Sequence, residues 1–321
     1  MIGKVPPDVL EGILDRTGRR DDAVRQHAAY GEDAACVDLG DRQLVISADP
    51  LSMASEQLGR IGIHVVCNDV AASGARPRWI TNTMFLPNDD PNVLETITSQ
   101  LHATALQLDL SIVGGHTEYN PDLSRPLLSL CAFGTTDRFV PTGGAEPGDV
   151  VLMTHAAGIE GTAILATDFE DRLRDAGVDT DIVDRGAEMI DDIGVLEAAM
   201  ACRSSASAMH DPTEGGIVTG LVEMAHASGV TIEAHREQID VHSETTTICQ
   251  AMGVDPLAIF GSGALIVAVS SEQGASLQGD LMENGVESSI IGRAREGPSQ
   301  LKLDGERIDA APRDELYKLW A

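Results

Sequence analysis

The segment 58–77 constrains the fold more than any other part of the sequence. It reads LGRIGIHVVCNDVAASGARP, an apolar run rich in small side chains that is closed by a glycine and Pro77. This pattern predicts a closely packed helix over 58–74. Asn68 and Asp69 interrupt its apolar run, and an unpaired buried carboxylate is costly. The pair is therefore expected to bind a ligand. The alternative for Asp69 is a purely structural pairing.

Short apolar segments elsewhere predict strands that mix with helices in both halves of the chain, without a regular βαβ alternation. We therefore expect an α+β protein with two layered domains rather than a Rossmann sheet. A turn-rich stretch predicts the boundary between them. These expectations give a first domain over 1–140, a second over 147–297 and a C-terminal tail over 298–321. Strands are expected at 42–49, 78–86, 110–115 (short and buried), 126–135, 150–155, 230–235, 263–270 and 288–294, and helices at 90–109, 159–173, 185–202, 214–229 and 271–285.

The composition is that of a globular protein with an aliphatic core. Its 321 residues are 43% hydrophobic but only 3% aromatic, and chains of this length commonly form two domains. No apolar run reaches the roughly 18 residues of a membrane span, and the first residues lack the apolar core of a signal peptide. The five cysteines include no Cys-x-x-Cys pair. A cytoplasmic protein with reduced thiols is therefore expected, without zinc or disulfides.

The charge balance is strongly acidic. The formal net charge is −29, and Lys4, Lys302 and Lys318 are the only lysines in the sequence. A surface so poor in lysine indicates adaptation to a high-salt cytoplasm, where screening removes the self-repulsion. It also repels nucleic-acid phosphate and anionic lipid, so neither is expected as a partner.

Five motifs place acidic residues at strand ends or among glycines: YGEDAACVD (30–38), ISADP (46–50), CNDVAASGARP (67–77), VGGHTEYN (113–120) and MHDPTEGGI (209–217). Each also has an ordinary structural interpretation. Glu32 and Asp33 could lie in a solvated turn, Asp49 could simply end a strand, His116 could be a core histidine, and Asp211 could cap a helix.

Together the motifs favour phosphate held through metal. Mg²⁺ prefers oxygen ligands and is commonly shared between carboxylates and substrate phosphate. Glycine-rich turns and helix N-termini let backbone N–H groups approach phosphate. Carboxylates alone would repel ATP, so a metal ion is expected between them. The sequence contains neither a P-loop nor a protein-kinase catalytic loop.

The order of these five motifs resembles the superfamily related to aminoimidazole ribonucleotide (AIR) synthetase. Its members include the purine cyclo-ligase, thiamine-monophosphate kinase, selenophosphate synthetase and the hydrogenase maturation factor HypE. The resemblance runs from about Gly3 to about Ala294. GEDAACVD is similar to the family's Gly-Asp-Asp-Ala-Ala segment with Glu32 for Asp, and HDPTEGGI to HypE's Asp-Pro-Thr-Arg-Gly-Gly with Glu214 for Arg.

The resemblance implies a PurM-like fold and a homodimer that binds ATP and Mg²⁺ in a cleft at the dimer interface. It implies metal ligation by Asp33, Asp49 and Asp69. Asp69, Asp211 and His116 are the candidate catalytic residues. The remaining matched positions would bind the nucleotide: Lys4, Asn68, Gly114, Gly115, Thr117, Glu118, Thr213, Gly215 and Gly216.

The motifs are most similar to a HypE-like subgroup. HypE acts on a cysteine at its own C-terminus, whereas the last cysteine here is Cys249, so that self-modification is not expected. We expect an ATP-dependent enzyme that phosphorylates or dehydrates a small substrate or a protein tail. Two alternatives remain: a non-enzymatic ATP-binding partner in a maturation complex, and a small-molecule kinase similar to thiamine-monophosphate kinase.

Overall fold

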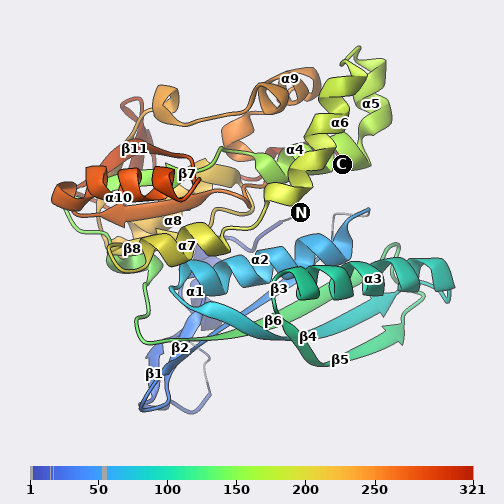
Figure 1. Ribbon diagram of the computed structural model, residues 1–321, viewed down its shortest axis with the longest axis horizontal. Helices are drawn as coiled ribbons and strands as arrows, with labels where there is room; N and C mark the ends of the chain where they lie inside the picture. Colours follow the sequence, from blue (N-terminus) through green and yellow to red (C-terminus); the bar gives the residue numbers. More distant parts are fainter. Residues whose placement is uncertain (1–2, 15, 17, 53–55, 321) are drawn as a thin grey trace.

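Each half of the chain builds one mixed β-sheet, and the two halves pack on each other (Figure 1). The structure is a computed structural model that describes residues 3–14, 16, 18–52 and 56–320. The α+β expectation is confirmed. Among the described residues, no helix is both long enough and apolar enough to cross a membrane.

The first sheet has six strands in the order β1-β2-β3-β6-β4-β5. Neighbouring strands are antiparallel except for β4 and β5, which run parallel. Three helices accompany the sheet: α1 (Pro7–Leu14), α2 (Leu58–Ala72) and α3 (Pro91–Gln107). The strands are β1 (Val24–Gln26), β2 (Ala35–Asp38), β3 (Gln43–Leu51), β4 (Arg76–Leu86), β5 (Ser111–Tyr119) and β6 (Leu127–Thr136).

Helix α2 is the predicted small-residue helix, and it lies between the first sheet and the second half of the chain (Figure 1). All but two of its side chains are buried. A Cβ on Gly59 would meet the carbonyl oxygen of Ile97 at 2.6 Å, and one on Gly62 would meet the Leu130 side chain at 2.7 Å. The glycines therefore let α3 and the sheet approach the helix backbone closely.

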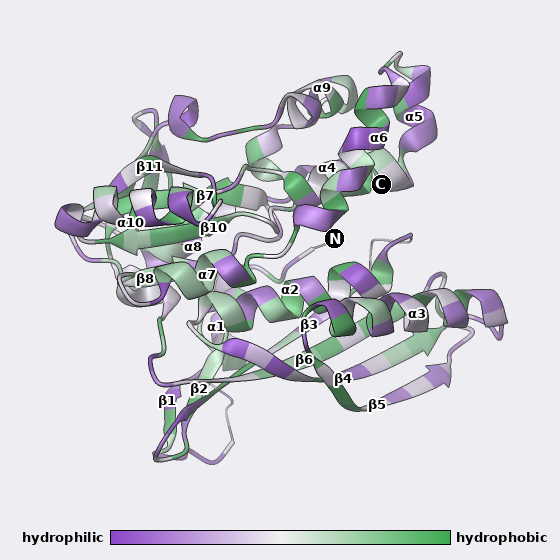
Figure 2. Cartoon of the chain, viewed as in Figure 1, coloured by the Kyte–Doolittle hydropathy of each residue, from purple (hydrophilic) through white to green (hydrophobic). Residues whose placement is uncertain are grey.

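The second sheet has seven strands in the order β13-β12-β9-β11-β7-β10-β8. In the interior strand β7, Val151 and Met153 join a core with α8, while Val150 and Leu152 join a core with α7 and α10. Helices thus cover both faces, and the neighbouring strands β7 and β10, which are largely apolar (Figure 2), are buried at every residue. The strands are β7 (Val150–Thr154), β8 (Ala208–His210), β9 (Thr231–Ala234), β10 (Leu265–Val269), β11 (Ser288–Arg295), β12 (Gln300–Leu303) and β13 (Glu306–Ile308).

Two long helices expected in the second half are interrupted. The helix expected over 159–173 ends at Phe169, whose φ of −124° leaves the helical region. The helix expected over 185–202 is broken at 193–195, where the backbone bonds to α2 instead. The helices are α4 (Ile159–Asp168), α5 (Glu170–Asp175), α6 (Thr180–Glu188), α7 (Leu196–Cys202), α8 (Gly216–Ser228), α9 (Ser243–Met252) and α10 (Ser271–Glu283), with short 3₁₀ turns η1 (Thr142–Gly144), η2 (Met189–Asp192), η3 (Arg236–Gln238), η4 (Pro256–Ala258) and η5 (Glu315–Lys318).

Two further expectations differ from the structure. The short strand expected to be buried is β5, which is longer and exposed along its whole length. It forms the edge of the sheet, and among the described strands it pairs with β4 alone. The expected tail over 298–321 contributes β12 and β13 to the second sheet, where β12 pairs in parallel with β9. The fold of the second half therefore continues beyond residue 297.

Candidate functional site

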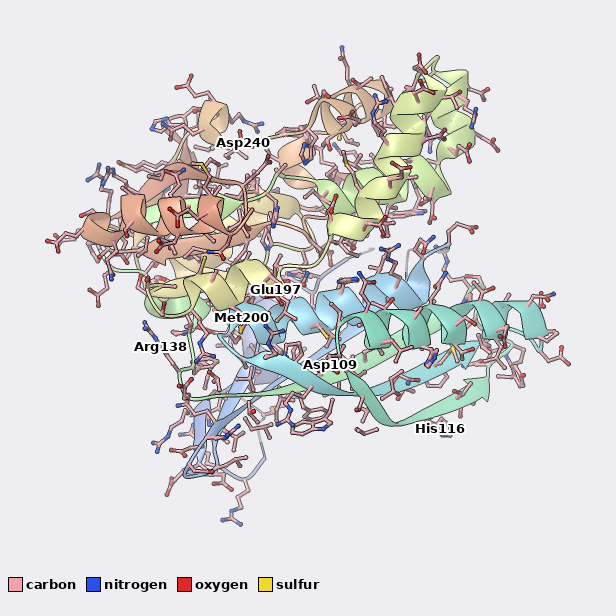
Figure 3. All side chains as sticks on the ribbon, viewed as in Figure 1. Asp109, His116, Arg138, Glu197, Met200 and Asp240 are labelled. Carbon is pink, nitrogen blue, oxygen red and sulfur yellow. The ribbon has the colours of Figure 1, made fainter. Side chains whose placement is uncertain are left out.

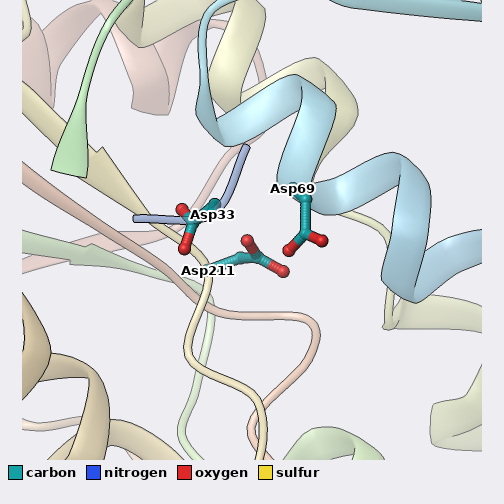
Figure 4. Close-up of side chains that lie close together, drawn as sticks. All are labelled: Asp33, Asp69 and Asp211. Carbon is teal, nitrogen blue, oxygen red and sulfur yellow. The ribbon is translucent and has the colours of Figure 1, made fainter. Parts of the chain in front are cut away.

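Three carboxylates converge where the two halves of the chain meet. Asp33, Asp69 and Asp211 each offer an oxygen within 4.8 Å of the others (Figure 4). Asp33 lies in the loop between β1 and β2, Asp69 on the buried helix α2, and Asp211 directly after β8. Residues far apart in the sequence thus build one group. It contains two of the three predicted metal ligands, Asp33 and Asp69, and two of the three predicted catalytic residues, Asp69 and Asp211.

Asp211 shows most clearly that the group is built for a ligand. Its side chain is 1% exposed, and neither carboxylate oxygen has a hydrogen-bond partner among the described residues. Burial, followed by the negative charge of Asp33, raises its pKa well above the usual range. Two orphaned carboxylate oxygens beside two further acids fit a hard cation with oxygen ligands. The alternative of a helix cap is excluded, because Gly215 occupies the N-cap of α8.

Asp69 has one hydroxyl partner and several acidic neighbours. Ser47 on β3 donates to its carboxylate. Burial and then the charges of Asp49 and Asp211 raise its pKa well above normal. Asp49, the third predicted metal ligand, lies on β3 beside this group but outside the three-carboxylate cluster. The structure therefore places Asp49 next to the cluster rather than in it.

Asn68, the neighbour of Asp69, joins the two halves of the chain. Its amide nitrogen donates to the carbonyl of Ile193 at 2.8 Å, and its amide oxygen accepts from the backbone N–H of Val195 at 3.0 Å. Both ends of the amide are therefore engaged with the break between η2 and α7. The contact expected of Asn68, with phosphate or metal, is not the contact seen here.

The Gly31–Glu32–Asp33 loop also crosses to the second half, so it is not a solvated turn. A Cβ on Gly31 would meet the Glu223 carbonyl at 2.9 Å. Glu32 accepts hydrogen bonds from the backbone N–H groups of Thr142 and Gly143 at 3.1 and 3.0 Å. Glu32, which stands where the family has Asp, thus fastens the linker between the sheets.

A buried histidine connects Asp33 to the interior of α8. His210 Nδ1 lies 2.5 Å from Asp33 Oδ1, and His210 Nε2 lies 3.1 Å from Glu223 Oε2. Burial alone would lower the pKa of His210, but the charges and hydrogen bonds of Asp33 and Glu223 raise it well above normal. The sequence interpretation missed both residues. Glu223 interrupts an apolar helix as Asp69 does, so the same reasoning would have identified it.

The start of α8 and the loop before it contact segments near both ends of the chain. Lys4 Nζ pairs with Glu223 at 3.3 Å, and its backbone N–H donates to Glu214 at 2.7 Å. The N–H of Gly215, expected to approach phosphate, donates to the buried Asp314 carboxylate at 2.7 Å. The carbonyl of Thr213 accepts from the N–H of Gly216 and of Gly261, each at 3.0 Å.

The predicted GGHTE residues lie apart, on the exposed edge strand β5 (Figure 3). Between this strand and α3 runs an open groove of about 510 Å³. His116 Nε2 lies 3.1 Å from Glu118, and it is not a core histidine. Among the described residues, no hydrogen bond or ion pair joins this groove to the three carboxylates. The predicted residues that line it are Gly114, Gly115, His116 and Thr117.

Comparisons with known proteins identify the family of this chain. Two family models match: the AIR synthase related protein N-terminal domain over residues 31–136 and its C-terminal domain over 146–303. A putative hydrogenase expression/formation protein of Methanocaldococcus jannaschii is 27% identical, and the match covers 82% of this chain and 79% of that protein. Carbamoyl dehydratase HypE of Escherichia coli is also 27% identical, with 84% and 82% covered.

Solved structures show the same fold. A HypE–HypF complex superposes with a TM-score of 0.75 at 20% identity, covering 95% of this chain and 99% of that one. A ThiL structure complexed with AMPPCP and TMP also reaches 0.75, at 22% identity, covering 95% and 94%. The PurM-like architecture expected from the motifs is therefore confirmed. With family models matching both halves of the chain, this protein belongs to the AIR synthase-related family, and it is similar to the HypE proteins of that family.

Proposed function

We propose that this protein is an ATP- and Mg²⁺-dependent dehydratase of the HypE type, acting on the carbamoyl group of a small molecule or a protein tail. The observation that carries the proposal is Asp211, whose two buried carboxylate oxygens have no described partner and face Asp33 and Asp69. The names of relatives in both comparisons support the reaction class: carbamoyl dehydratase among the sequences and HypE with ATP among the structures.

In this mechanism Asp33, Asp69 and Asp211 would hold a metal ion, which when bound would neutralise charge on the phosphate chain of ATP. The substrate carbonyl oxygen attacks the γ-phosphorus and ADP leaves; loss of the phosphorylated oxygen as phosphate, with two protons from nitrogen, then leaves a nitrile. The protein acts mainly by positioning these groups and balancing their charge. Lys4, whose side chain is half-exposed beside Glu223, would supply a cation to the phosphates.

A homodimer would complete the site. The first sheet has an apolar face opposite α2 and α3, where Ile46, Phe133 and Trp79 stand side by side on β3, β6 and β4 and are only half-buried. A second copy covering this face and the edge strand β5 would bring the groove with Gly114, His116 and Thr117 into a shared nucleotide cleft. His116 would then act at that interface.

The test measures ATP and metal binding together with turnover. In high-KCl buffer, MgCl₂ with a non-hydrolysable ATP analogue should raise the melting temperature, and ATP with a carbamoylated acceptor should yield ADP and phosphate. Asp211→Asn should lose both effects. Asp175→Asn, at an exposed acid at the end of α5, should retain them. Metal-independent nucleotide binding, or an unaffected Asp211→Asn, would contradict the proposal.

One observation favours a second candidate, a non-enzymatic ATP-binding partner. The Gly215 N–H, which would otherwise be free to bind a phosphate, is occupied by the protein's own Asp314. If this contact persists with nucleotide bound, ATP would bind without being cleaved. Tight analogue binding with no turnover on carbamoylated, amide or alcohol acceptors would support this role, whereas phosphate transfer to an alcohol would indicate a kinase.

A further inference from the structure

A continuous chain of charged contacts leads from the N-terminal segment to the three carboxylates. Lys4 Nζ lies 3.3 Å from Glu223 Oε1, Glu223 Oε2 lies 3.1 Å from His210 Nε2, and His210 Nδ1 lies 2.5 Å from Asp33 Oδ1. The side chains of Glu223, His210 and Asp33 are each 6% exposed. We refer to Lys4, Glu223, His210 and Asp33 as the relay.

The relay alternates in charge. Cationic Lys4 and His210 flank anionic Glu223, whose pKa falls to about 2 because these two cations outweigh the effect of burial. Each of the two inner side chains uses both of its polar ends. Glu223 contacts Lys4 and His210, and His210 contacts Glu223 and Asp33. Rotation of either inner member would break a buried hydrogen bond and leave a buried polar group without a partner, which is costly. The side chains therefore hold one another in one arrangement.

These contacts fix the orientation of the Asp33 carboxylate. Its Oδ1 faces His210, while Oδ2 faces Thr142 Oγ1 at 3.3 Å. The carboxylate orientation toward Asp69 and Asp211 is thus set by residues that do not belong to the cluster. Groups that orient metal ligands in this way commonly change metal affinity 10- to 100-fold when they are removed.

We propose that His210 and Glu223 are positioning residues for a divalent cation held by Asp33, Asp69 and Asp211, and that they couple its binding to the docking of the N-terminal segment through Lys4. This inference rests on the proposed metal-dependent function and adds two residues and a regulated segment to it. Because coupling is reciprocal, a cation that fixes Asp33 also fixes the surface on which Lys4 docks, and undocking Lys4 weakens cation binding.

The experiment uses Mn²⁺ as the probe, with binding measured by electron paramagnetic resonance on the full chain at high salt. We expect His210→Asn to weaken Mn²⁺ binding about 10- to 100-fold. Glu223→Gln keeps the shape but removes the charge, and Lys4→Met leaves the inner contacts in place, so smaller losses are expected, in that order. Lys4 is half-exposed, so its replacement does not endanger folding.

The chain offers a matched control pair. Lys302 Nζ lies 3.2 Å from Glu233 on the second sheet, with both side chains about 40% exposed and neither touching the carboxylate cluster. Lys302→Met and Glu233→Gln should therefore leave Mn²⁺ binding unchanged. An equal loss in these variants would show a general charge effect and overturn the positioning role.

A second measurement separates positioning from simple structural support. In the wild-type protein, Mn²⁺ should slow hydrogen exchange in the peptide that contains Gly3 and Lys4, and in His210→Asn it should not. If the wild-type protein binds no Mn²⁺, the proposed function itself fails. If it binds Mn²⁺ but Glu223→Gln binds equally well and exchange near Lys4 does not respond, only the coupling is refuted.

Discussion

Asn68 and Asp69 are adjacent on α2 but serve different parts of the molecule. The Asn68 amide bonds to the backbone of Ile193 and Val195 in the second half of the chain. The Asp69 carboxylate joins Asp33 and Asp211 in the cluster. One residue of the pair thus holds the two halves together, and the other belongs to the carboxylate cluster where they meet.

The role of Asn68 predicts a large loss of stability for Asn68→Ala. The change removes two buried hydrogen bonds and leaves a carbonyl and an N–H without partners, which should cost about 2–4 kcal/mol. Chemical unfolding at high salt measures the cost. Asn82→Ala, at a half-buried position of β4, is the control and should cost less than half as much. Equal losses of unfolding free energy in the two variants would show that the Asn68 contacts between the two halves contribute no more to stability than the Asn82 side chain does.

The carboxylate cluster predicts a trade-off between the stability of the metal-free protein and its ability to bind metal. Burial and mutual repulsion raise the pKa values of Asp69 and Asp211, so both acids destabilise the metal-free protein at neutral pH. Asp69→Asn should therefore raise the metal-free melting temperature by a few degrees. It should also abolish the further rise produced by MgCl₂. A variant that is less stable without metal would show that Asp69 is chiefly a structural partner of Ser47.

Asp314 and Glu160 predict how stability depends on pH. Burial raises the pKa of each to about 7. Both are protonated in the folded protein at pH 5 but ionised in the unfolded chain. Their stabilising contribution to the free energy of unfolding is therefore complete below about pH 4 and is lost as the pH rises to about 7. Asp314→Asn should reduce this loss by an amount on the order of 1–3 kcal/mol. The measured quantity is the change in unfolding free energy between pH 5 and 7.5.

The matched control is Asp309→Asn, at an exposed acid close to the same end of the chain. Its pH profile should follow that of the wild-type protein. Comparing changes between two pH values cancels any constant cost of the asparagine, such as the hydrogen bond lost at Leu316. If the unfolding free energy of Asp314→Asn changed with pH as much as that of the wild-type protein, the raised pKa assigned to Asp314 would be refuted.

The half-buried apolar face of the first sheet predicts a substitution that should disrupt the proposed homodimer. Phe133 lies in the middle of the apolar row between Ile46 and Trp79. Phe133→Glu would place a charge in the interface and should give a folded monomer by light scattering. Leu106→Glu, at a residue of α3 that is 67% exposed, should leave the oligomeric state unchanged. A wild-type monomer at micromolar concentration would exclude this dimer.

The acidic composition predicts salt dependence. A net charge of −29 is self-repulsive at low ionic strength, and screening relieves it. The melting temperature should rise by several degrees between about 0.1 and 1 M KCl, measured by circular dichroism. Sorbitol at matched osmolarity is the control. If sorbitol reproduces the shift, charge screening is not its cause.

Several features followed from the sequence because they depend on local pattern. The helix over 58–74 was expected at nearly its observed position, since its glycines and its stop are local features. The α+β class followed from strands that mix with helices. Asp33 and Asp69 were expected to meet because the motif order resembles a family whose fold brings these positions together. Their spacing of 36 residues would not by itself predict the contact.

The tertiary structure decided which polar groups contact each other. Asn68 and Asp69 look equivalent in the sequence, yet a rotation of about 100° along the helix directs one toward a backbone break and the other toward two acids. β5 is exposed because its second neighbour is missing, and strand order is not written in any single segment. His210 reaches Asp33 across 177 residues. Such contacts arise only when two sheets pack, so a single sequence indicates the acids that need a partner and the fold decides which partner each one finds.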